Sequence, residues 1–209
     1  MRGTKSGLLA VGIVFLASAG TALADTIIGT PRDDNLVGTQ RADFISALRG
    51  DDRVRGLGGN DWINGGPGDD VLNGDGECPS GPGYYYCVPG RDGDDRVSGG
   101  SGDDTIRGEG GRDRLSGQSG DDRINGGDGA DRLRGGSGRD TVIGRAGADD
   151  INPGSGRDEV RGGDGPDRIF TRDGDRDFVD CGAGFDLVLA DRRDDVSRDC
   201  EFVIRTGRR

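Results

Sequence analysis

Aliphatic residues return at a fixed interval along most of the chain, with polar residues around them. From Ile27 onward an aliphatic residue recurs every nine positions, and after one irregular stretch the series resumes at Val88. Most of the flanking residues are polar, as Arg114 and Ser116 are around Leu115. Because alternate residues of a strand point to opposite faces, this pattern predicts short strands that each bury one side chain. These aliphatic anchors are Ile27, Leu36, Ile45, Val54, Ile63, Leu72, Val88, Val97, Ile106, Leu115, Ile124, Leu133, Val142, Ile151, Val160 and Ile169.

Glycine and aspartate share the same nine-residue register. Glycine recurs two and five residues after most anchors, and an aspartate follows seven residues after fourteen of them. Each unit is therefore predicted to be a Gly-rich turn, an aspartate and a short strand. A helix is disfavoured, because glycine in a helix interior costs about 1 kcal/mol relative to alanine. The fourteen aspartates are Asp34, Asp43, Asp52, Asp61, Asp70, Asp95, Asp104, Asp113, Asp122, Asp131, Asp140, Asp149, Asp158 and Asp167.

Three units show the pattern in its clearest form: residues 65–73 (GGPGDDVLN), 99–107 (GGSGDDTIR) and 135–143 (GGSGRDTVI). They match the nonapeptide G-G-x-G-x-D-x-U-x, where U is aliphatic, and the chain from Ile27 to Asp177 resembles haemolysin-type (RTX) calcium-binding repeat proteins. The resemblance implies an all-β fold, a right-handed parallel β-roll or solenoid. It also implies that two units form one coil and that calcium ions lie between successive turns.

The residue types suit calcium, which takes six to eight hard oxygen ligands. Glycine turns can direct carbonyl oxygens inward, and we expect the fourteen repeat aspartates to supply the charged metal ligands. Two carboxylates about 5 Å apart repel by about 3 kcal/mol at an effective dielectric near 20. We therefore expect folding to require calcium, with roughly ten ions bound. Counting two units per coil predicts one ladder of Asp34, Asp52, Asp70, Asp95, Asp113, Asp131, Asp149 and Asp167, and another of Asp43, Asp61, Asp104, Asp122, Asp140 and Asp158.

Several units depart from the pattern, and we expect their sites to be weak or empty. Arginine precedes the repeat aspartate at Arg112, Arg139 and Arg157, and Arg176 takes an aspartate slot. The first glycine is replaced by Ala47, Pro153 and Thr171, and the second by Thr30 and Thr39. Asp173, Asp175 and Asp177 have the opening spacing of an EF-hand loop, but Phe178 stands where that loop needs glycine. We interpret these three aspartates as the degenerate end of the roll.

Residues 1–24 have the layout of a cleaved secretory signal peptide. Arg2 and Lys5 precede an apolar run, which ends near Ala22-Leu23-Ala24. The run is short for a permanent membrane span, although an uncleaved anchor is the alternative. We expect a secreted protein whose mature chain begins at Asp25 and contains no membrane span.

The four cysteines form two local pairs, and export favours disulfides. Cys78 and Cys87 lie towards the ends of a predicted loop insertion at about residues 73–87. This insertion would add a net seven residues to the roll, which is predicted to span about residues 25–177. Its tyrosines Tyr84–Tyr86 either form a contact surface or pack onto the roll. Cys181 and Cys200 are predicted to staple a C-terminal cap at residues 178–209, in which the Gly-Asp turns vanish and the anchors continue as Phe178, Leu187 and Val196.

Composition narrows the function further. The chain has no histidine, which removes the Ser-His and Cys-His catalytic pairs and histidine-ligated metals. Its formal net charge of −11 gives no reason to expect a nucleic-acid partner. We expect a non-enzymatic, monomeric calcium-binding module with a structural or interaction role. The alternatives are an adhesin-like binder of extracellular polysaccharide or cell surface and, less favoured, a carboxylate-based polysaccharide-modifying enzyme.

Overall fold

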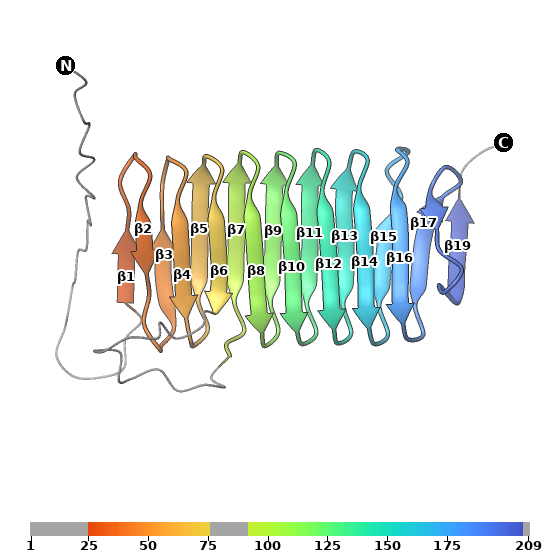
Figure 1. Cartoon of the computed structure of the whole chain (residues 1–209), viewed down its shortest axis with the longest axis horizontal. Coiled ribbons are helices and arrows are strands. Elements are labelled where there is room, and N and C mark those ends of the chain that lie inside the picture. The colour runs from red at the N-terminus through yellow and green to blue at the C-terminus, as the bar shows by residue number, and fades with distance from the viewer. Residues whose placement is uncertain (1–24, 76–91, 207–209) are drawn as a thin grey trace, which may run out of the picture.

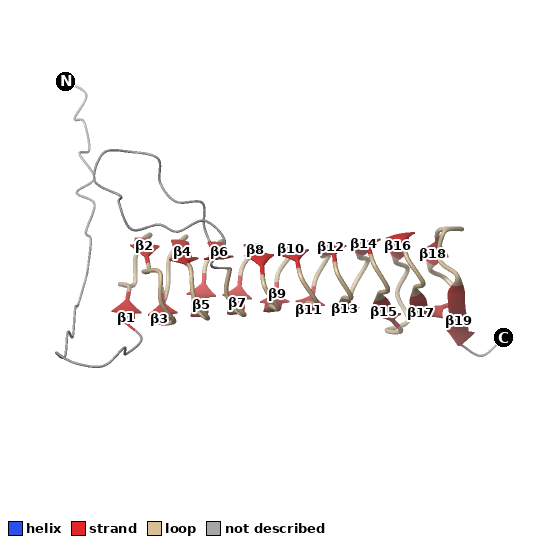
Figure 2. Cartoon of the chain, turned by 90° about the horizontal axis from the view of Figure 1, so that it is seen from below, coloured by secondary structure: helices blue, strands red, loops and turns tan. Residues whose placement is uncertain are grey.

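The computed structural model describes residues 25–75 and 92–206, and these residues form an all-β parallel solenoid of about nine turns. Figure 1 shows the strands side by side in one elongated stack, and Figure 2 shows that the stack has two layers. No helix occurs in the described ranges, so none there is long and apolar enough to cross a membrane. The predicted signal peptide, Cys78, Cys87 and Tyr84–Tyr86 lie outside the described residues.

Successive strands alternate between two parallel sheets. The odd sheet contains β1 (Asp25–Ile28), β3 (Asp43–Ser46), β5 (Trp62–Pro67), β7 (Arg96–Ser101), β9 (Arg114–Ser119), β11 (Arg132–Ser137), β13 (Asp150–Ser155), β15 (Arg168–Thr171), β17 (Leu187–Asp191) and β19 (Phe202–Thr206). The even sheet contains β2 (Asn35–Val37), β4 (Arg53–Leu57), β6 (Val71–Asp75), β8 (Thr105–Gly110), β10 (Arg123–Asp128), β12 (Thr141–Ala146), β14 (Glu159–Asp164), β16 (Phe178–Ala183) and β18 (Asp195–Val196). One coil is therefore one odd and one even strand.

Equivalent residues of successive coils stand directly beside one another. Ile124 of β10 pairs with Ile106 of β8 and with Val142 of β12, each eighteen positions away along the chain. The two-unit coil follows from this register and confirms the prediction. Identical residue types thus form columns along the solenoid, and each column is buried or exposed as a whole.

The core is a thin double row of aliphatic anchors between the two sheets. Ile45, Ile63, Ile106, Leu133 and Ile151 are each at most 1% exposed, whereas the residues on either side of them point outward. Burying one such side chain stabilises the fold by about 1.5–3 kcal/mol. With one anchor per unit, no other group of side chains contributes comparable apolar burial.

Numbering the unit G-G-x-G-x-D-x-U-x from 1 to 9 places positions 6, 8 and 1 on the inner face of the solenoid. In β10 and its preceding residue, Asp122, Ile124 and Gly126 are buried, and Arg123 between them is exposed. The strands are longer than predicted, up to six residues, because positions 2 and 3 also pair between coils, as Gly127 does with Arg145 and Asp128 with Ala146. The aspartate at position 6 therefore points into the solenoid.

The insertion between β6 and β7 is longer than the sequence register indicated. Anchors Leu72 and Val97 belong to successive strands although 25 positions separate them, and Trp62 of β5 pairs with Arg96 of β7. Because β5 pairs directly with β7 and β6 with β8, the prediction of a net seven-residue insertion was wrong. Val88 lies outside the described residues.

The end of the solenoid also differs from the prediction. The buried anchors are Val179 and Val188, one residue later than predicted, and Phe178 is 44% exposed. A further Gly-Asp turn is present in residues 181–189 (CGAGFDLVL), where Cys181 takes position 1 and Asp186 takes position 6. The predicted disulfide between Cys181 and Cys200 is confirmed, with Cα atoms 5.3 Å apart. Whether residues 178–209 act as a cap remains a prediction.

Candidate metal centre

All fourteen aspartates predicted as ligands are buried, with at most 7% exposure. Each lies just before or at the start of a strand, where the turn enters the sheet and position 6 faces inward. Asp177 and Asp186 occupy the same position in later units and are equally buried. Sequence reasoning missed both, because a one-residue longer turn before Asp177 shifts the register; Arg176 is exposed and does not take the aspartate slot.

The aspartates form two ladders, one on each long edge. In each ladder the backbone N–H of one aspartate donates to Oδ1 of the aspartate in the next coil, at 2.7–3.0 Å. The even ladder precedes the even strands and consists of Asp34, Asp52, Asp70, Asp104, Asp122, Asp140, Asp158 and Asp177. The odd ladder consists of Asp43, Asp61, Asp95, Asp113, Asp131, Asp149, Asp167 and Asp186.

The predicted ladders were therefore wrong beyond the insertion, where the two edges were exchanged. Asp70 donates to Asp104 and Asp61 donates to Asp95, each across 34 positions. The predicted order counted a strand at Val88 and therefore placed Asp95 directly after Asp70. The aspartates themselves were identified correctly, because their spacing within each unit does not depend on the insertion.

One oxygen of nearly every ladder carboxylate has no partner. Oδ1 accepts the hydrogen bond from the previous rung, but Oδ2 is buried and accepts none in fourteen rungs. Burying a carboxylate oxygen without a partner costs free energy. A positive group beside each of these atoms would therefore stabilise the fold. The fourteen atoms are Oδ2 of Asp52, Asp61, Asp70, Asp95, Asp104, Asp113, Asp122, Asp131, Asp140, Asp149, Asp158, Asp167, Asp177 and Asp186.

Glycine makes room for these oxygens and brings further oxygens close. A methyl group placed on Gly126 would lie 2.4 Å from Oδ2 of Asp131, so the carboxylate occupies the space of an absent side chain. Gly129 has φ of +142°, and a methyl group there would lie 1.5 Å from the carbonyl oxygen of Gly111 in the previous coil. The space between turns is therefore bounded by carboxylate and carbonyl oxygens, the ligand set that hard cations such as calcium prefer.

The first rung of each ladder is satisfied by protein groups instead. Thr30 and Thr39 occupy position 2 of their units, where the nonapeptide pattern has glycine. Their backbone N–H groups donate to Oδ2 of Asp34 and Asp43 at 2.5 and 2.6 Å, and their hydroxyl groups bond the same carboxylates. These threonines supply donors where the remaining rungs have none.

Arginine before the repeat aspartate leaves the ladder unchanged. Arg112 and Arg139 are exposed, and their backbone N–H groups donate to Oδ1 of Asp94 and Asp121 in the previous coil. Asp113 and Asp140, which follow them, are fully buried like their neighbours. The arginine side chains therefore do not enter the space between the ladder carboxylates.

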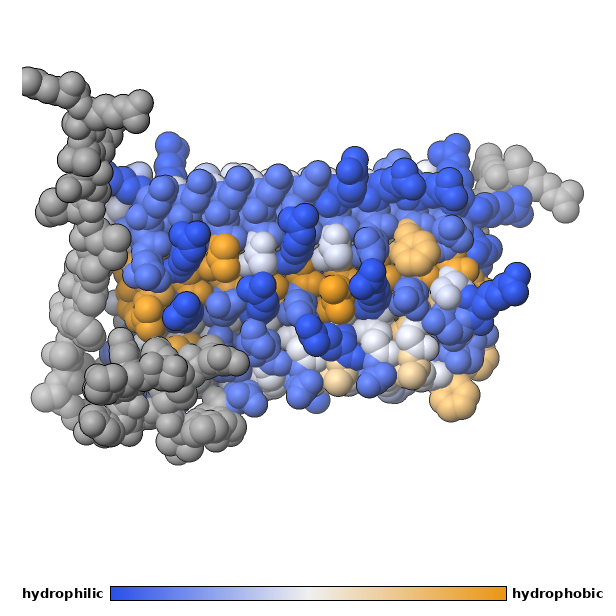
Figure 3. Space-filling model, viewed as in Figure 1, coloured by the Kyte–Doolittle hydropathy of each residue, from blue (hydrophilic) through white to orange (hydrophobic). Residues whose placement is uncertain are grey.

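Position 5 on the even edge forms a second, exposed row of carboxylates that the sequence reasoning did not single out. Each Oδ1 in this row accepts the backbone N–H of position 5 in the next coil, as Asp51 does from Asp69 at 3.1 Å. The row strengthens the negative charge along the edge at the top of Figure 3, which is a continuous hydrophilic band. Its members are Asp33, Asp51, Asp69, Asp103 and Asp121.

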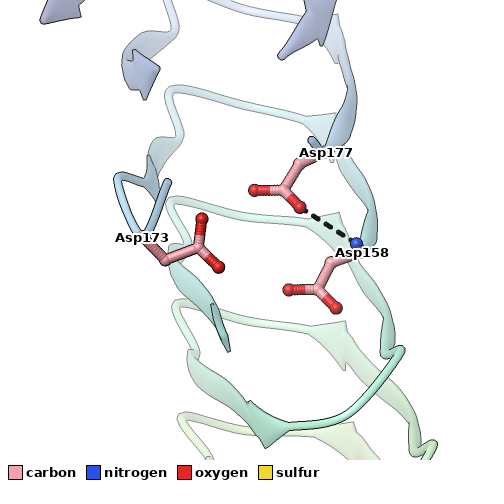
Figure 4. A group of neighbouring side chains, drawn as sticks. All are labelled: Asp158, Asp173 and Asp177. Carbon is pink, nitrogen blue, oxygen red and sulfur yellow. Dashed lines mark hydrogen bonds between the residues drawn. The ribbon is translucent and has the colours of Figure 1, made fainter. Parts of the chain in front are cut away.

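One irregular turn adds a third carboxylate to the even ladder. Asp158, Asp173 and Asp177 each place a carboxylate oxygen within 4.8 Å of the others, and Figure 4 shows the three side chains turned toward a common space. Asp173 is held there because its two oxygens accept the backbone N–H groups of Gly156 and Asp175. The EF-hand spacing was rightly dismissed as a separate loop, but Asp173 and Asp177 join Asp158 in one acidic cluster.

Burial strongly raises the pKa values of the ladder aspartates. Loss of water contact is the main cause that raises the pKa of Asp61 and Asp113 to about 8 and that of Asp140 to about 7. The negative charges of neighbouring rungs add to this increase, and the backbone hydrogen bonds oppose it. In the absence of a cation, the folded chain therefore holds protons that the unfolded chain has released.

Comparison with known proteins agrees with this chemistry. A family model for the RTX calcium-binding nonapeptide repeat matches residues 20–52, 28–63, 46–77, 89–124, 125–160 and 154–188. These matches cover most of the chain and include every rung of both ladders. A search of the curated proteins found no match.

The raised pKa values predict how the metal-free protein responds to pH. Because the folded pKa lies above the unfolded value of 3.8, the unfolding free energy should fall as pH rises through the window from about 4 to about 8. In chelator, the β-sheet signal in circular dichroism should be stronger at pH 5 than at pH 8, and saturating calcium should reverse that order. A metal-free stability that rises from pH 5 to pH 8 would contradict the buried, unpaired ladders.

Proposed function

The chain belongs to the RTX calcium-binding nonapeptide repeat family, and we propose that it is a secreted module whose folding is coupled to calcium binding. RTX repeats bind calcium and form structural modules. Our proposal goes further in assigning the ladder aspartates as ligands and in making the metal a condition of folding.

The observation that supports the proposal is the set of fourteen buried Oδ2 atoms without a partner. Each ladder has one such atom for every step between successive rungs. Calcium would supply the missing positive charge, and turn carbonyl oxygens such as that of Gly111 would complete its oxygen ligands. Since the unfolded chain does not bring these groups together, the binding free energy becomes folding free energy.

The ladders also set an upper limit on the number of ions. One ion at each step with an unpaired oxygen gives fourteen, more than the roughly ten expected from the sequence. The difference arises because the corrected register keeps both ladders continuous past the insertion and adds Asp177 and Asp186. We propose that the first rungs, Asp34 and Asp43, depend least on calcium because threonines already satisfy them.

A matched pair of variants tests the ligand assignment. Asp122 is a buried rung of the even ladder, and Asp121 next to it is exposed. Oδ1 of Asp122 accepts the backbone N–H of Asp104, and Oδ1 of Asp121 accepts that of Arg139. Asp122→Asn and Asp121→Asn change the charge equally and preserve that acceptor. We expect Asp122→Asn to bind fewer calcium ions and to need at least about tenfold more calcium to fold, because a direct ligand is lost.

Equilibrium dialysis gives the number of ions per chain, and circular dichroism during the calcium titration gives the folding midpoint. Asp121→Asn should stay close to the wild-type midpoint. Equal effects of the two substitutions would show that only overall charge matters, and the ligand assignment would then be wrong.

The cluster of Asp158, Asp173 and Asp177 is proposed to hold calcium more tightly than a step with two ladder carboxylates. A third carboxylate adds negative charge at the ion, and charge count raises the affinity of calcium sites. Asp173→Asn should therefore remove the tightest step of the binding isotherm. Asp175→Asn serves as the control, since Asp175 lies in the same turn but outside the cluster. An unchanged isotherm in Asp173→Asn would refute the role of Asp173.

Export is proposed because residues 1–24 have the layout of a signal peptide. The first strand begins at Asp25, whose backbone nitrogen lies 3.1 Å from Oδ1 of Asp43. Cleavage after Ala24 would convert this nitrogen into a charged amino terminus beside the first rung of the odd ladder. Mass spectrometry of protein recovered outside the producing cells should give a chain that starts at Asp25; an intact N-terminus would contradict cleavage.

We propose a binding role rather than catalysis and a monomeric state for the module. The chain has no histidine, and its buried carboxylates all belong to the stack or its ends, where they accept backbone N–H groups or a threonine hydroxyl. A second disulfide, between Cys78 and Cys87, remains part of the proposal, because both residues lie outside the described ranges.

A further inference from the structure

The outer face of the odd sheet has one column of side chains that the calcium ladders do not explain. Position 7 of successive coils places Phe44, Trp62, Arg96, Arg114 and Arg132 in direct register. All five are exposed, with Phe44 at 39% and Trp62 at 53%. We call these five residues the basic–aromatic column.

The three stacked arginines form no ion pair in the described part of the chain, although the next residue of the column, beside Arg132, is Asp150. The ion pairs found there join Arg161 to Glu159 and Arg176 to Asp195, and neither involves this column. Like charges directly opposite each other on neighbouring strands are destabilising. The even sheet avoids this arrangement, because Arg123 at the same position stands between Thr105 and Thr141. Stacking the three arginines therefore adds no stability to this sheet.

A groove lies at the arginine end of the column. It has a volume of about 300 Å³ and is lined by four arginines and four aspartates: Arg112, Arg114, Arg132 and Arg168, and Asp113, Asp131, Asp149 and Asp150. Its lining also includes Ala130 and Ala148, which occupy position 5, where the even edge has its exposed row of aspartates. The side chains at position 5 are small at Ala130 and Ala148, which leaves the groove open there.

A second column runs beside the first on the same face. Position 9 supplies Ser46, Asn64, Ser98, Ser116 and Arg134, again in direct register. Hydroxyl and amide groups both donate and accept hydrogen bonds, so they can pair with the hydroxyl groups of a sugar. At the opposite end of the column from the groove, Phe44 and Trp62 are in edge-to-face contact, with ring centroids 5.7 Å apart, and expose apolar ring surface.

We propose that this face binds a linear acidic polysaccharide laid along the solenoid axis. Arginines match its carboxylate or sulfate groups, the position-9 side chains match its hydroxyl groups, and the aromatic pair offers a surface for its C–H groups. A nucleic acid is less suited, because its dense phosphate charge would meet a chain of net charge −11 that offers only a short basic column. The inference rests on the proposed function in one respect: calcium must neutralise the odd ladder, whose Asp113, Asp131 and Asp149 line the groove.

The test uses a short oligogalacturonate, with its methyl-esterified form as a neutral control and a single-stranded DNA oligonucleotide as the competing class. Trp62 is the only tryptophan in the chain and lies in the column, so its fluorescence reports ligand on this face. In saturating calcium we expect the oligogalacturonate to change the Trp62 emission and to bind more tightly than the other two.

Two double variants with the same net charge distinguish specific binding at the basic–aromatic column from non-specific electrostatic attraction. Arg114→Ser with Arg132→Ser should weaken binding about a hundredfold, about tenfold for each lost charge-assisted contact. Arg53→Ser with Arg123→Ser removes the same charge from position 7 of the even sheet and should change the affinity by less than about twofold. The first pair should also be at least as stable as wild type, since it relieves repulsion within the column.

Several results would overturn the inference. They are absence of binding by calcium-loaded, folded protein, equal weakening in the two double variants, or tighter binding of the DNA. Circular dichroism on the same samples shows whether the chain folds with calcium, so failure of the polysaccharide site can be told from failure of the proposed calcium-coupled folding. A chain that folds with calcium but ignores the oligosaccharide refutes only the polysaccharide site, whereas a chain whose folding ignores calcium refutes the coupling.

Discussion

Buried carboxylates stacked at every turn are the constraint on which the rest of the structure depends. Beyond the first rung of each ladder, every rung accepts the backbone N–H of the previous rung, yet its second oxygen is buried without a donor. The apolar core offsets little of the free-energy cost of these buried carboxylates, because each unit buries only one aliphatic side chain. A cation between the turns converts the least favourable feature of the fold into its main cross-link between coils.

Protein groups satisfy the second carboxylate oxygen only at the first rung of each ladder, and the last rungs still have an unpartnered Oδ2. Thr30 and Thr39 donate to the first rungs, whereas the last rungs, Asp177 and Asp186, donate onward to Asp194 and Glu201. The disulfide between Cys181 and Cys200 ties the last Gly-Asp turn to the chain that follows it. A stack of identical units needs such endings, since its terminal coils lack a neighbour on one side.

Local spacing predicted the repeat unit well because one register specifies both the strand and the turn. The aliphatic anchors of the described residues up to Ile169 and the fourteen buried aspartates follow from that register, whereas the parallel two-unit coil was implied by the resemblance to RTX repeats. Long-range pairing was harder, because the length of an insertion does not reveal how many strands it contains. Val88 falls on the nine-residue spacing and was counted as an anchor. This count assigned the aspartates beyond it to the wrong ladders. At Asp177 a single extra turn residue had a similar effect, and it hid a further repeat at residues 181–189. The clustering of Asp173 with Asp158 depends on turn conformation, which the spacing of residues does not specify.

The central claim is that the ladders hold the chain in shape only with a cation between their rungs. The most direct measurement is the circular dichroism spectrum and thermal melt of the disulfide-intact chain, in chelator and in about 1 mM calcium, with magnesium as a control. The account predicts strong β-sheet signal and a cooperative melt in calcium, with most of that signal lost in chelator and little recovered in magnesium. Full β-sheet signal in chelator, with a melt no earlier than in calcium, would contradict it.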